Sequence, residues 1–495
     1  MSDFGAGLNF IIVGASVSGL ASAIALKNSS HSVLLLEKAR QLGGTGSVPN
    51  GSGCAEIPPN GTKILLDWGL ETALKANSAP ISGFSAYKYA AGEASSPDQL
   101  GINCWDPELL SAARGGYSQF LHRDLIHILY DHALEPSAKG GSVSVLFGAE
   151  VVNVDCDACS VTLRSGQVHT GDAIIGADGA NGVIRRVLLE EEDESPESDV
   201  PAEIVAYSSL VPNDLVRKHN LAAVFDGYPG CTVWFGPNRA LRTFPTGKDH
   251  DVSLLLYTPD SSETGTWTGE VDKNIMDVLG SCDGHIQKLA ALAGPATCVQ
   301  IKQPYDLESW VSQSGRVLAV GDAAHPFSPG TGHSYAVALE DGTFIGKIFS
   351  HTRNSNRVPE FFRAFHEHRH MEKEYIFHMT LPDGPFQEGR DAAMRERHAS
   401  GQNLLHGDLK QMLEDYEMMY PLLLLAAEQP DNNPHRYGYE AADDADEWWI
   451  SWGRYRDDAA ISRGPEGHRP QSGLFNMAFS SFTSQVPGTE SVKDI

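Results

Sequence analysis

The feature that most constrains the fold lies in residues 9–37. An apolar run, NFIIVGA, ends at a glycine, a helical stretch from Ser18 to Lys27 follows, and a second apolar run, SVLLLE, ends at Glu37. A strand, a glycine-rich turn, a helix and a second strand within about 30 residues make a βαβ unit. The pattern therefore predicts an α/β protein with a parallel sheet.

The turn inside this unit, GASVSG from Gly14 to Gly19, matches the dinucleotide fingerprint GxGxxG except that Ser16 replaces the middle glycine. Those glycines allow a tight turn, close approach of a pyrophosphate and close helix–strand packing, while the helix N-terminus offers N–H donors to phosphate. Glu37 follows at the end of the second strand, where a carboxylate can accept from ribose hydroxyls. We expect this unit to bind a dinucleotide; a merely structural turn is the alternative.

Two later turns also follow apolar strands. The first, over 176–182, contains the step Asp178–Gly179, which by itself is most often only a turn. The second, RVLAVGDAAHP followed by PGTG, places Asp322 at the tip of a strand and leads through a Gly/Pro-rich loop into a helix over about 336–347. A carboxylate beside a helix N-terminus suits a sugar hydroxyl and a delocalised anion.

Taken together in this order, the three motifs resemble those of the flavoprotein aromatic hydroxylases, single-component FAD monooxygenases that include salicylate and 4-hydroxybenzoate hydroxylases. Other segments are similar to the salicylate-hydroxylase-like branch: IPPN at 57–60, LHRDL at 121–125, LPDGP at 381–385 and YGY at 437–439. The resemblance covers residues from about 8 to 450. It implies a Rossmann-like FAD-binding domain interleaved with a β-sheet substrate domain, plus a helical C-terminal segment.

The expected arrangement alternates between these two domains. FAD-binding parts are expected over 8–80, 121–190 and 310–356, substrate-domain parts over 81–120 and 200–305, a helical region over 357–455 and an irregular tail over 456–495. The acidic run Glu190–Glu194 is expected to be a mobile, solvated loop.

The resemblance also implies which residues contact FAD. Glu37 would hold the adenosine ribose, Arg123 would reach the cofactor from its helix, and Asp322 would bond the ribityl–pyrophosphate region. Backbone N–H groups near Ser334 and Tyr335 would face the N1–C2=O edge of the flavin, where negative charge collects on reduction.

Asp178 and Gly179 would serve both FAD and the transient NADPH or NADH, which delivers hydride before the reduced flavin reacts with O2. An electron-rich aromatic ring, usually a phenolate, then receives one oxygen atom. The complete expected set of cofactor contacts is Gly14, Ser16, Gly19, Glu37, Arg123, Asp178, Gly179, Asp322, Gly332, Ser334 and Tyr335.

Catalytic and substrate residues are expected on the third motif and on the aromatic-rich strands. His325 is the expected general base, because imidazole titrates near neutral pH; capping the loop or ordering a water are its alternative roles. Arg242 is a candidate to bind a substrate carboxylate and Trp234 to stack on the ring, with a solvated strand edge and sheet packing as the alternatives. Phe244 and Pro329 complete the expected substrate contacts.

Four positions depart from the family pattern. Some fungal relatives have a catalytic Arg after a strand tyrosine and a catalytic Tyr before a proline, where this chain has Ser208 and Phe244. The dearomatising mechanism that uses that pair is therefore not expected. Ser334 stands where the third loop usually ends in glycine, and Gly182 stands where the second motif often has serine.

Composition excludes several classes of partner. Lys plus Arg number 37 against 64 Asp plus Glu, a formal net charge of −27, which repels nucleic acid and anionic membranes. An anionic cofactor must then be held by local donors. We read no signal peptide and no membrane span, and the seven scattered cysteines favour a reduced, cytoplasmic compartment. The oligomeric state is expected to be a monomer or a homodimer.

Two metal-like patterns have simpler interpretations. Cys156 and Cys159 form a CxxC in a probable hairpin turn without a second pair, so a solvated turn is favoured over zinc. His366, His368 and His370 lie among Arg and Lys without an HExxH pattern, which favours an exposed amphipathic helix.

The leading hypothesis is an aromatic hydroxylase, in its sharpest form one that oxidatively decarboxylates a phenolic acid. An epoxidase or hydroxylase of an alkaloid or terpenoid is the second hypothesis. A flavin-binding interaction protein without turnover is a third, from another class. A flavin halogenase is disfavoured because WxWxIP is absent after the first motif.

Overall fold

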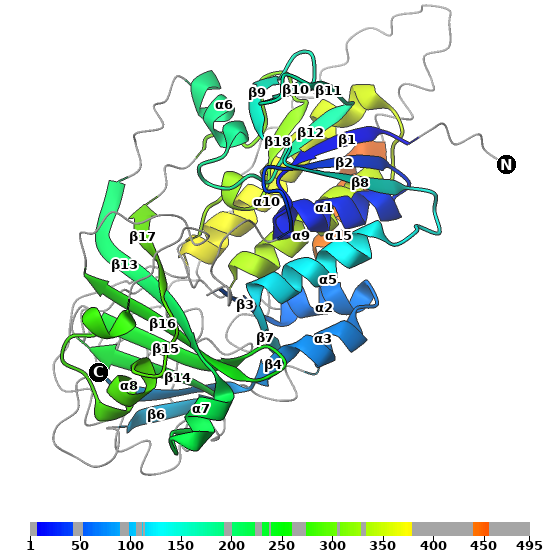
Figure 1. The fold of residues 1–495 in the computed structure, drawn as a ribbon. Coiled ribbons are helices and arrows are strands. Elements are labelled where there is room, and N and C mark those ends of the chain that lie inside the picture. Colours follow the sequence, from blue (N-terminus) through cyan, green and yellow to red (C-terminus); the bar gives the residue numbers. More distant parts are fainter. Residues whose placement is uncertain are drawn as a thin grey trace, which may run out of the picture. The chain divides into compact units, whose positions relative to one another are not determined.

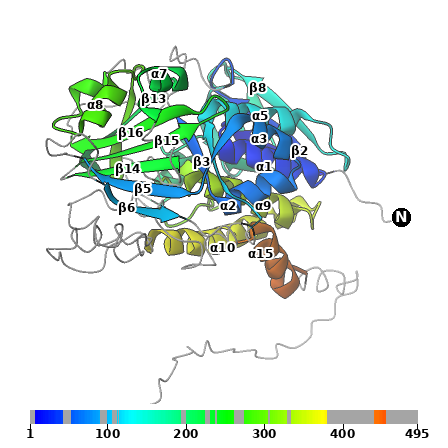
Figure 2. The same cartoon turned by 90° about the horizontal axis from the view of Figure 1, so that it is seen from below.

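The computed structural model describes residues 7–42, 53–89, 99–104, 111, 114–192, 200–222, 230–236, 239–259, 274–303, 307–327, 333–378 and 439–454. In these ranges the strands form four sheets (Figures 1 and 2). Two of them, a parallel sheet and a large mostly antiparallel sheet, carry the predicted motifs and the aromatic-rich strands.

The parallel sheet has five strands in the order β18-β12-β1-β2-β8. Every neighbouring pair is parallel. Strands β1, β12 and β18 are almost wholly buried, which explains their continuous apolar runs, whereas the edge strand β8 alternates and is partly exposed. Their bounds are β1 Asn9–Val13, β2 Ser32–Glu37, β8 Ser142–Phe147, β12 Ala173–Gly176 and β18 Val317–Ala319.

Helix α1 (Val17–Asn28) is packed on all sides, and every residue from Val17 to Lys27 is buried. It lies against α9 (Ser334–Phe349), where a Cβ added at Gly342 or Gly346 would come within 2.6 Å of α1 atoms. These two glycines therefore let the helices approach closely. The contact fixes the start of α9 relative to the GASVSG turn.

The large sheet has seven strands in the order β17-β13-β16-β15-β14-β5-β6. One face packs on helices α7 (Asn213–Lys218) and α8 (Gly284–Ala290) in a separate hydrophobic core that includes Leu241 and Leu256. The strands are β5 Gly83–Lys88, β6 Gln99–Cys104, β13 Val200–Val211, β14 Gly230–Gly236, β15 Arg239–Thr246, β16 Asp251–Pro259 and β17 Thr297–Gln303.

A small antiparallel sheet, β3-β7-β4, lies between the seven-stranded sheet and three helices (Figure 1). Its strands are β3 Cys54–Ile57, β4 Ser78–Ile81 and β7 Tyr117–Leu121. The helices are α2 Pro59–Asp67, α3 Glu71–Asn77 and α5 His122–Leu134. The remaining three strands, β9 Val151–Asp155, β10 Ser160–Leu163 and β11 Val168–Thr170, form an antiparallel meander.

The α/β class and the βαβ unit are confirmed, as are the strands and turns over 143–176, where residues 156–159 form the β9–β10 turn. The acidic run is a correction. Helix α6 (Val183–Glu191) extends into it, and Glu192 Oε1 accepts from Ser309 N at 2.9 Å. Glu191 and Glu192 thus accept from the backbone N–H groups of Gln313 and Ser309, while residues 193 and 194 lie outside the described residues.

The helical C-terminal region is represented by α10 (Val358–His378) and α15 (Ala441–Trp448). Helix α10 buries three phenylalanines, Phe361, Phe362 and Phe365, and also the charged Arg369, so its description as an exposed amphipathic helix was too simple. The LPDGP segment and the tail 456–495 lie outside the described residues. Among the described helices, none combines the length and apolarity that a membrane crossing requires.

Candidate functional site

The three sequence motifs meet at one edge of the parallel sheet. They follow β1, β12 and β18, which are adjacent in the sheet and parallel, so their carboxyl ends lie side by side. In open α/β sheets this edge is where ligands bind. Neighbouring strands therefore bring together three segments that are far apart in the sequence.

The first turn shows why two of its glycines are required. Gly14 has φ +102°, and a Cβ there would lie 2.4 Å from the carbonyl oxygen of Ala177 in the second motif. A Cβ on Gly19 would lie 2.1 Å from the carbonyl oxygen of Gly14. Ser16 instead caps α1, because its Oγ accepts from Gly19 N at 3.3 Å. The departure from GxGxxG thus exchanges a glycine for a favourable N-cap.

Glu37 lies at the end of β2 and Arg123 lies in the first turn of α5. The Glu37 carboxylate accepts from Ala15 N at 2.9 Å and from Ala39 N at 2.8 Å, so it holds the first turn against the end of β2. A carboxylate has further lone pairs, which remain suitable for a ribose hydroxyl. Arg123 lies on α5 with 43% of its side chain exposed and its Nε 3.4 Å from Asp124 Oδ1.

The second motif buries a carboxylate. Asp178 Oδ2 accepts from Ile184 N at 3.2 Å, while its buried Oδ1 has no partner among the described residues. Burial raises the pKa of Asp178 to about 6. A Cβ on Gly182 would lie 2.2 Å from Asp178 Cγ, so the family's serine would not fit here. Gly179 has φ +85° in open space.

Arg185, at the start of α6, joins the second motif to the third. Its Nη1 donates to the carbonyl oxygens of Ala323 and Ala324 at 3.1 and 3.3 Å. The third motif also contacts the first, since a Cβ on Gly321 (φ +56°) would lie 2.4 Å from Ser18 Oγ. Each of the three turns, or the residue that follows it, therefore contacts the other two.

Asp322 lies at the tip of β18, as predicted. Its side chain is exposed, yet burial by surrounding protein raises its pKa, with His325 and the backbone of Phe327 acting in the opposite direction. Gly332 and Pro329 lie outside the described residues.

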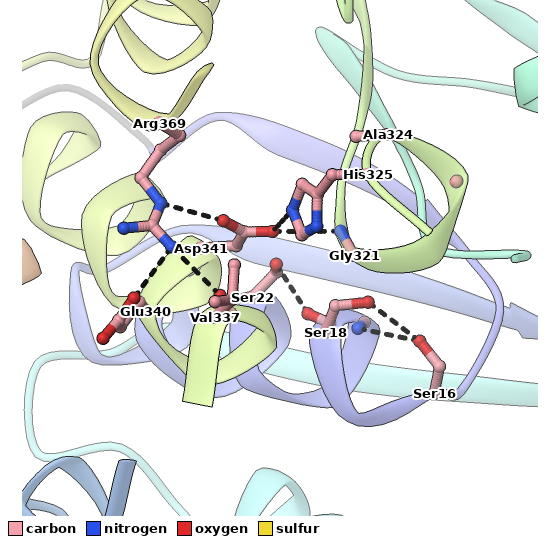
Figure 3. A network of polar contacts seen from close by, with 12 residues as sticks. Ser16, Ser18, Ser22, Gly321, Ala324, His325, Val337, Glu340, Asp341 and Arg369 are labelled. Carbon is pink, nitrogen blue, oxygen red and sulfur yellow. Dashed lines mark hydrogen bonds and ion pairs between the residues drawn. The ribbon is translucent and has the colours of Figure 1, made fainter. Parts of the chain in front are cut away.

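His325 is buried in an ionic network (Figure 3). Only 1% of the residue is exposed, and its Nε2 lies 2.7 Å from Asp341 Oδ2. Arg369 Nε donates to Asp341 Oδ1 at 3.0 Å, and Arg369 Nη2 donates to Glu340 Oε2 at 2.9 Å. This placement corresponds to the capping alternative, and a catalytic role for His325 stays a prediction.

Arg242 forms a second buried pair on the seven-stranded sheet. Its Nη2 lies 2.6 Å from Glu56 Oε2 of β3, and the guanidinium lies 5.5 Å from the centre of the Phe244 ring. The expected strand-edge alternative does not describe it, because Arg242 is fully buried. Trp234 stacks on Tyr87 within the core on the opposite face of the sheet, so sheet packing describes its position.

Tyr335 connects these two regions. It lies in the first turn of α9, and its hydroxyl is 3.0 Å from His122 Nδ1 and 3.4 Å from the carbonyl oxygen of Cys54 on β3. Burial lowers the pKa of His122 to about 4, so this imidazole is neutral at pH 7. Ser334 and Tyr335 both start α9, where backbone N–H groups lack intrahelical acceptors.

Several of these residues were missed by sequence reasoning: Glu56, His122, Glu340, Asp341 and Arg369. Asp341 and Glu340 are adjacent acids in the otherwise apolar stretch SYAVALEDGTFIGKIF, a signal that could have marked them. Arg369 carried no comparable signal, because an Arg among helical His and Lys residues is typical of a solvated face.

The described residues contain no group of three or more metal-type ligands. The rings of His366 and His370 both lie against Trp310, and His368 Nδ1 contacts Asp444 at 2.7 Å. The donor set at the sheet edge instead fits a dinucleotide such as FAD. It offers a helix N-terminus, glycines that leave the backbone open, and two carboxylates, Asp178 and Asp322, suited to hydroxyl donors.

Comparison with known proteins agrees with this fit. The model of the "FAD binding domain" family matches residues 8–378. The chain is 28% identical over 429 residues to the FAD-dependent monooxygenase atnJ of Arthrinium sp, covering 83% of this chain and 93% of that protein. It is 26% identical over 414 residues to hispidin-3-hydroxylase of Neonothopanus nambi, covering 80% and 93%.

Among solved structures, a salicylate hydroxylase substrate complex superposes with a TM-score of 0.62 at 17% identity, covering 89% of this chain and 97% of that one. This likeness concerns the fold. Because the family model spans most of the described chain and its motifs converge on one site, the protein belongs to the FAD binding domain family, and FAD is its cofactor.

Proposed function

We propose that the protein is a monooxygenase that uses FAD, NADPH or NADH, and O2 to hydroxylate an aromatic, phenolic ring. The observation that carries this proposal is the convergence of the three motifs on one sheet edge, where Asp322 is exposed on the turn after β18. The names of the relatives support it, since they include a monooxygenase and a hydroxylase.

Bound FAD would supply the hydride acceptor and the reaction with O2. The chain would bind its pyrophosphate at the N-terminus of α1 and its hydroxyl groups with Glu37, Asp178 and Asp322. Backbone donors at Ser334 and Tyr335 would stabilise negative charge at the start of α9.

The Tyr335 hydroxyl is the candidate for contact with the substrate phenol. Its hydrogen bond with neutral His122 Nδ1 orients the hydroxyl, which also lies 3.4 Å from the carbonyl oxygen of Cys54 on β3. An enclosed cavity would exclude water from the reacting oxygen. In this scheme His325 holds the turn that carries Asp322 and does not receive the substrate proton.

We further propose that the substrate ring is uncharged rather than a phenolic acid. In register across the seven-stranded sheet, Arg242 lies between Leu255 and Val233, with Ala86 beyond, and it is the one charged residue of this row. Its charge is matched by Glu56 at 2.6 Å, with side-chain exposures of 1% and 7%. The pair offers no uncompensated cation to a carboxylate.

The other buried Lys and Arg residues of the described chain are engaged as well. Their acceptors are main-chain oxygens for Lys27 and Arg185, and carboxylates for Lys63, Arg357 and Arg369. A buried carboxylate without a cation is strongly disfavoured. This argues against the phenolic-acid form of the hypothesis and hence against oxidative decarboxylation.

The test is aerobic NADPH and NADH consumption by FAD-loaded protein with a panel of neutral phenols and their matched phenolic acids, under ¹⁸O2. We expect stimulated consumption and a product that gains one labelled oxygen without loss of CO2. Consumption that yields only hydrogen peroxide, or no stimulation by any compound, would refute the hydroxylase. Labelled product formed from the acids alone would refute the neutral substrate but retain the hydroxylase.

A further inference from the structure

The carboxylate of Asp341 lies in the interior of α9 and has three partners, two from the Gly321–His325 turn and one from α10. Oδ2 accepts from Gly321 N at 2.9 Å and from His325 Nε2 at 2.7 Å, and Oδ1 accepts from Arg369 Nε at 3.0 Å (Figure 3). An ionised carboxylate can only accept, so the His325 proton lies on Nε2. Both carboxylate oxygens of Asp341 therefore accept hydrogen bonds at the same time.

The charge of this carboxylate depends on its neighbours. Burial works to raise the pKa of Asp341, but His325 and Arg369 outweigh it and hold the pKa below its ordinary value. At the adjacent Glu340 burial dominates and the pKa is raised, even though Arg369 Nη2 and Asn60 Nδ2 both donate to it. His325 and Arg369 therefore together favour the ionised form of Asp341 inside the protein, and Arg369 is the partner that comes from the C-terminal region.

Arg369 belongs to α10, in the C-terminal helical region. Its guanidinium lies 5.2 Å from the centre of the Tyr439 ring, and the Tyr439 hydroxyl donates to Asp444 Oδ2 of α15 at 2.8 Å. Only 1% of Arg369 is exposed. The same residue therefore contacts the C-terminal helices and the carboxylate that holds the third motif.

The held turn needs such a constraint. Gly321 has φ +56° and its Cα lies against Ser18, so its backbone conformation is restricted on one side by α1 and on the other by the bond to Asp341. Asp322 follows directly, and its direction is set by the peptide whose N–H Asp341 binds. Displacement of Asp341 would redirect Asp322.

We propose that Arg369 is a positioning residue for FAD: through Asp341 it holds the Gly321–His325 turn that directs Asp322 into the FAD site. Helix α10 then takes part in FAD binding although it contributes no expected FAD contact. The proposal rests on the FAD site of the family and is independent of the reaction catalysed.

The test compares Arg369→Met with Arg357→Met. Arg357 is also a buried arginine of the C-terminal region; it pairs with Glu360 at 3.3 Å and lies 4.9 Å from the Phe361 ring. Both variants are expected to lower the thermal midpoint. Only Arg369→Met is expected to weaken FAD binding, by about 10-fold or more, as measured by quenching of flavin fluorescence.

A second measurement needs neither FAD nor substrate. In apo protein, amide hydrogen exchange of the segment 320–327 is expected to accelerate in Arg369→Met and to stay at the wild-type rate in Arg357→Met. If Arg369→Met does not fold, Arg369→Lys keeps the charge without the two-nitrogen fork and is expected to show the same changes at smaller amplitude.

Unchanged FAD affinity and exchange in a folded Arg369 variant would overturn the proposal. Equal losses in Arg357→Met would also overturn it, because they would show a general effect of destabilising the C-terminal region. Neither FAD affinity nor hydrogen exchange involves NADPH, O2 or a phenol. A negative result in these two experiments therefore does not contradict the proposed monooxygenase activity, and absence of that activity does not contradict the role of Arg369.

Discussion

Two buried arginines, Arg369 and Arg242, lie in different regions of the protein and have different sets of partners. Arg369, beside the parallel sheet, meets two carboxylates, and one of these also binds a backbone N–H and a histidine. Arg242, on the seven-stranded sheet, pairs with the carboxylate of Glu56 and lies near the neutral thiols of Cys54 and Cys231, whose pKa burial raises to about 12.

The difference shows two uses of a buried ion pair. The Arg369 network fixes backbone geometry, because its shared acceptor holds a glycine turn. In the Arg242–Glu56 pair the carboxylate cancels the charge of Arg242, so the row of the seven-stranded sheet that contains Arg242 presents no net charge. A buried pair contributes little net stability over an apolar replacement, while removing one partner is costly. Substitutions in the two regions should therefore have different consequences.

The largest effect is expected for Asp341→Asn. Arg369 loses one of its two carboxylate partners and Gly321 N loses a charged acceptor, so the free energy of unfolding should fall by about 3–5 kcal/mol, with loss of FAD. Because the pKa of Asp341 is held low, its contribution is present above about pH 4 and is lost as pH falls through the folded pKa. The deficit of the variant should then shrink at acid pH.

Denaturation of wild type and variant across this pH range checks the expectation. Asp67→Asn is the control, since Asp67 forms an ion pair with Arg114 in which both side chains are more than half exposed. Its thermal midpoint should match the wild type. A deficit in Asp341→Asn that is independent of pH would contradict the ionic account.

A change of selectivity is expected for Glu56→Gln. The amide can still accept from Arg242 but no longer cancels its charge, so the free energy of unfolding should fall by about 2 kcal/mol. Affinity for 2,4-dihydroxybenzoate should rise about 10-fold relative to resorcinol, which differs by the carboxylate alone. Calorimetry on wild type, Glu56→Gln and Glu360→Gln, the control from the Arg357 pair, measures this ratio.

An unchanged affinity ratio in Glu56→Gln would contradict the proposal that the substrate is uncharged. The same holds if the wild-type protein already binds 2,4-dihydroxybenzoate more tightly than resorcinol. Either result would leave the Arg369 network unaffected, since that network lies on helices α9 and α10, whereas Glu56 and Arg242 lie on strands β3 and β15.

A stabilisation that depends on pH is expected for Asp178→Asn in apo protein. The folded pKa of Asp178, about 6, lies above its unfolded value, so native stability is highest below about pH 4, falls between pH 4 and 6 and stays reduced above. The amide avoids this cost, on the order of 3 kcal/mol, at pH 7.5. Melting curves at pH 4 and 7.5 should show the gain only at the higher pH.

The smallest effect is expected when both members of the sheet pair are replaced. Arg242→Met with Glu56→Leu should leave stability within about 1–2 kcal/mol of the wild type, whereas each single substitution costs more. A double-mutant cycle measured by chemical denaturation gives the coupling. Additive losses would show that the pair is a packing feature without electrostatic coupling.

The fold could largely be predicted from the sequence, because the patterns that indicate it are local. The run NFIIVGA, the turn at Gly14 and Gly19 and the run SVLLLE each express a short-range constraint, namely burial of a strand or close approach of a backbone. The same applies to Asp322 at a strand tip. The acidic run was misread because Glu192 is ordered by Ser309, a residue far along the chain.

The partners in the buried ion pairs could not be predicted from local sequence patterns. Glu56 and Arg242 are 186 positions apart, and Asp341 and Arg369 are 28 apart on different helices. Nothing in either local pattern distinguishes a charge that is buried against a partner from one that faces water. Trp234 likewise follows a strand pattern that does not state which face of the sheet carries the ligand.

The sequence by itself determined the βαβ unit, the three turns and the family to which they belong, because glycine conformation and hydrophobic periodicity act within a few residues. The tertiary structure alone decided that His325 is held by Asp341, that Arg242 is neutralised by Glu56 and that Arg369 reaches the third motif. The physical reason is that burial of a charge depends on groups supplied by distant segments, and only folding brings them together.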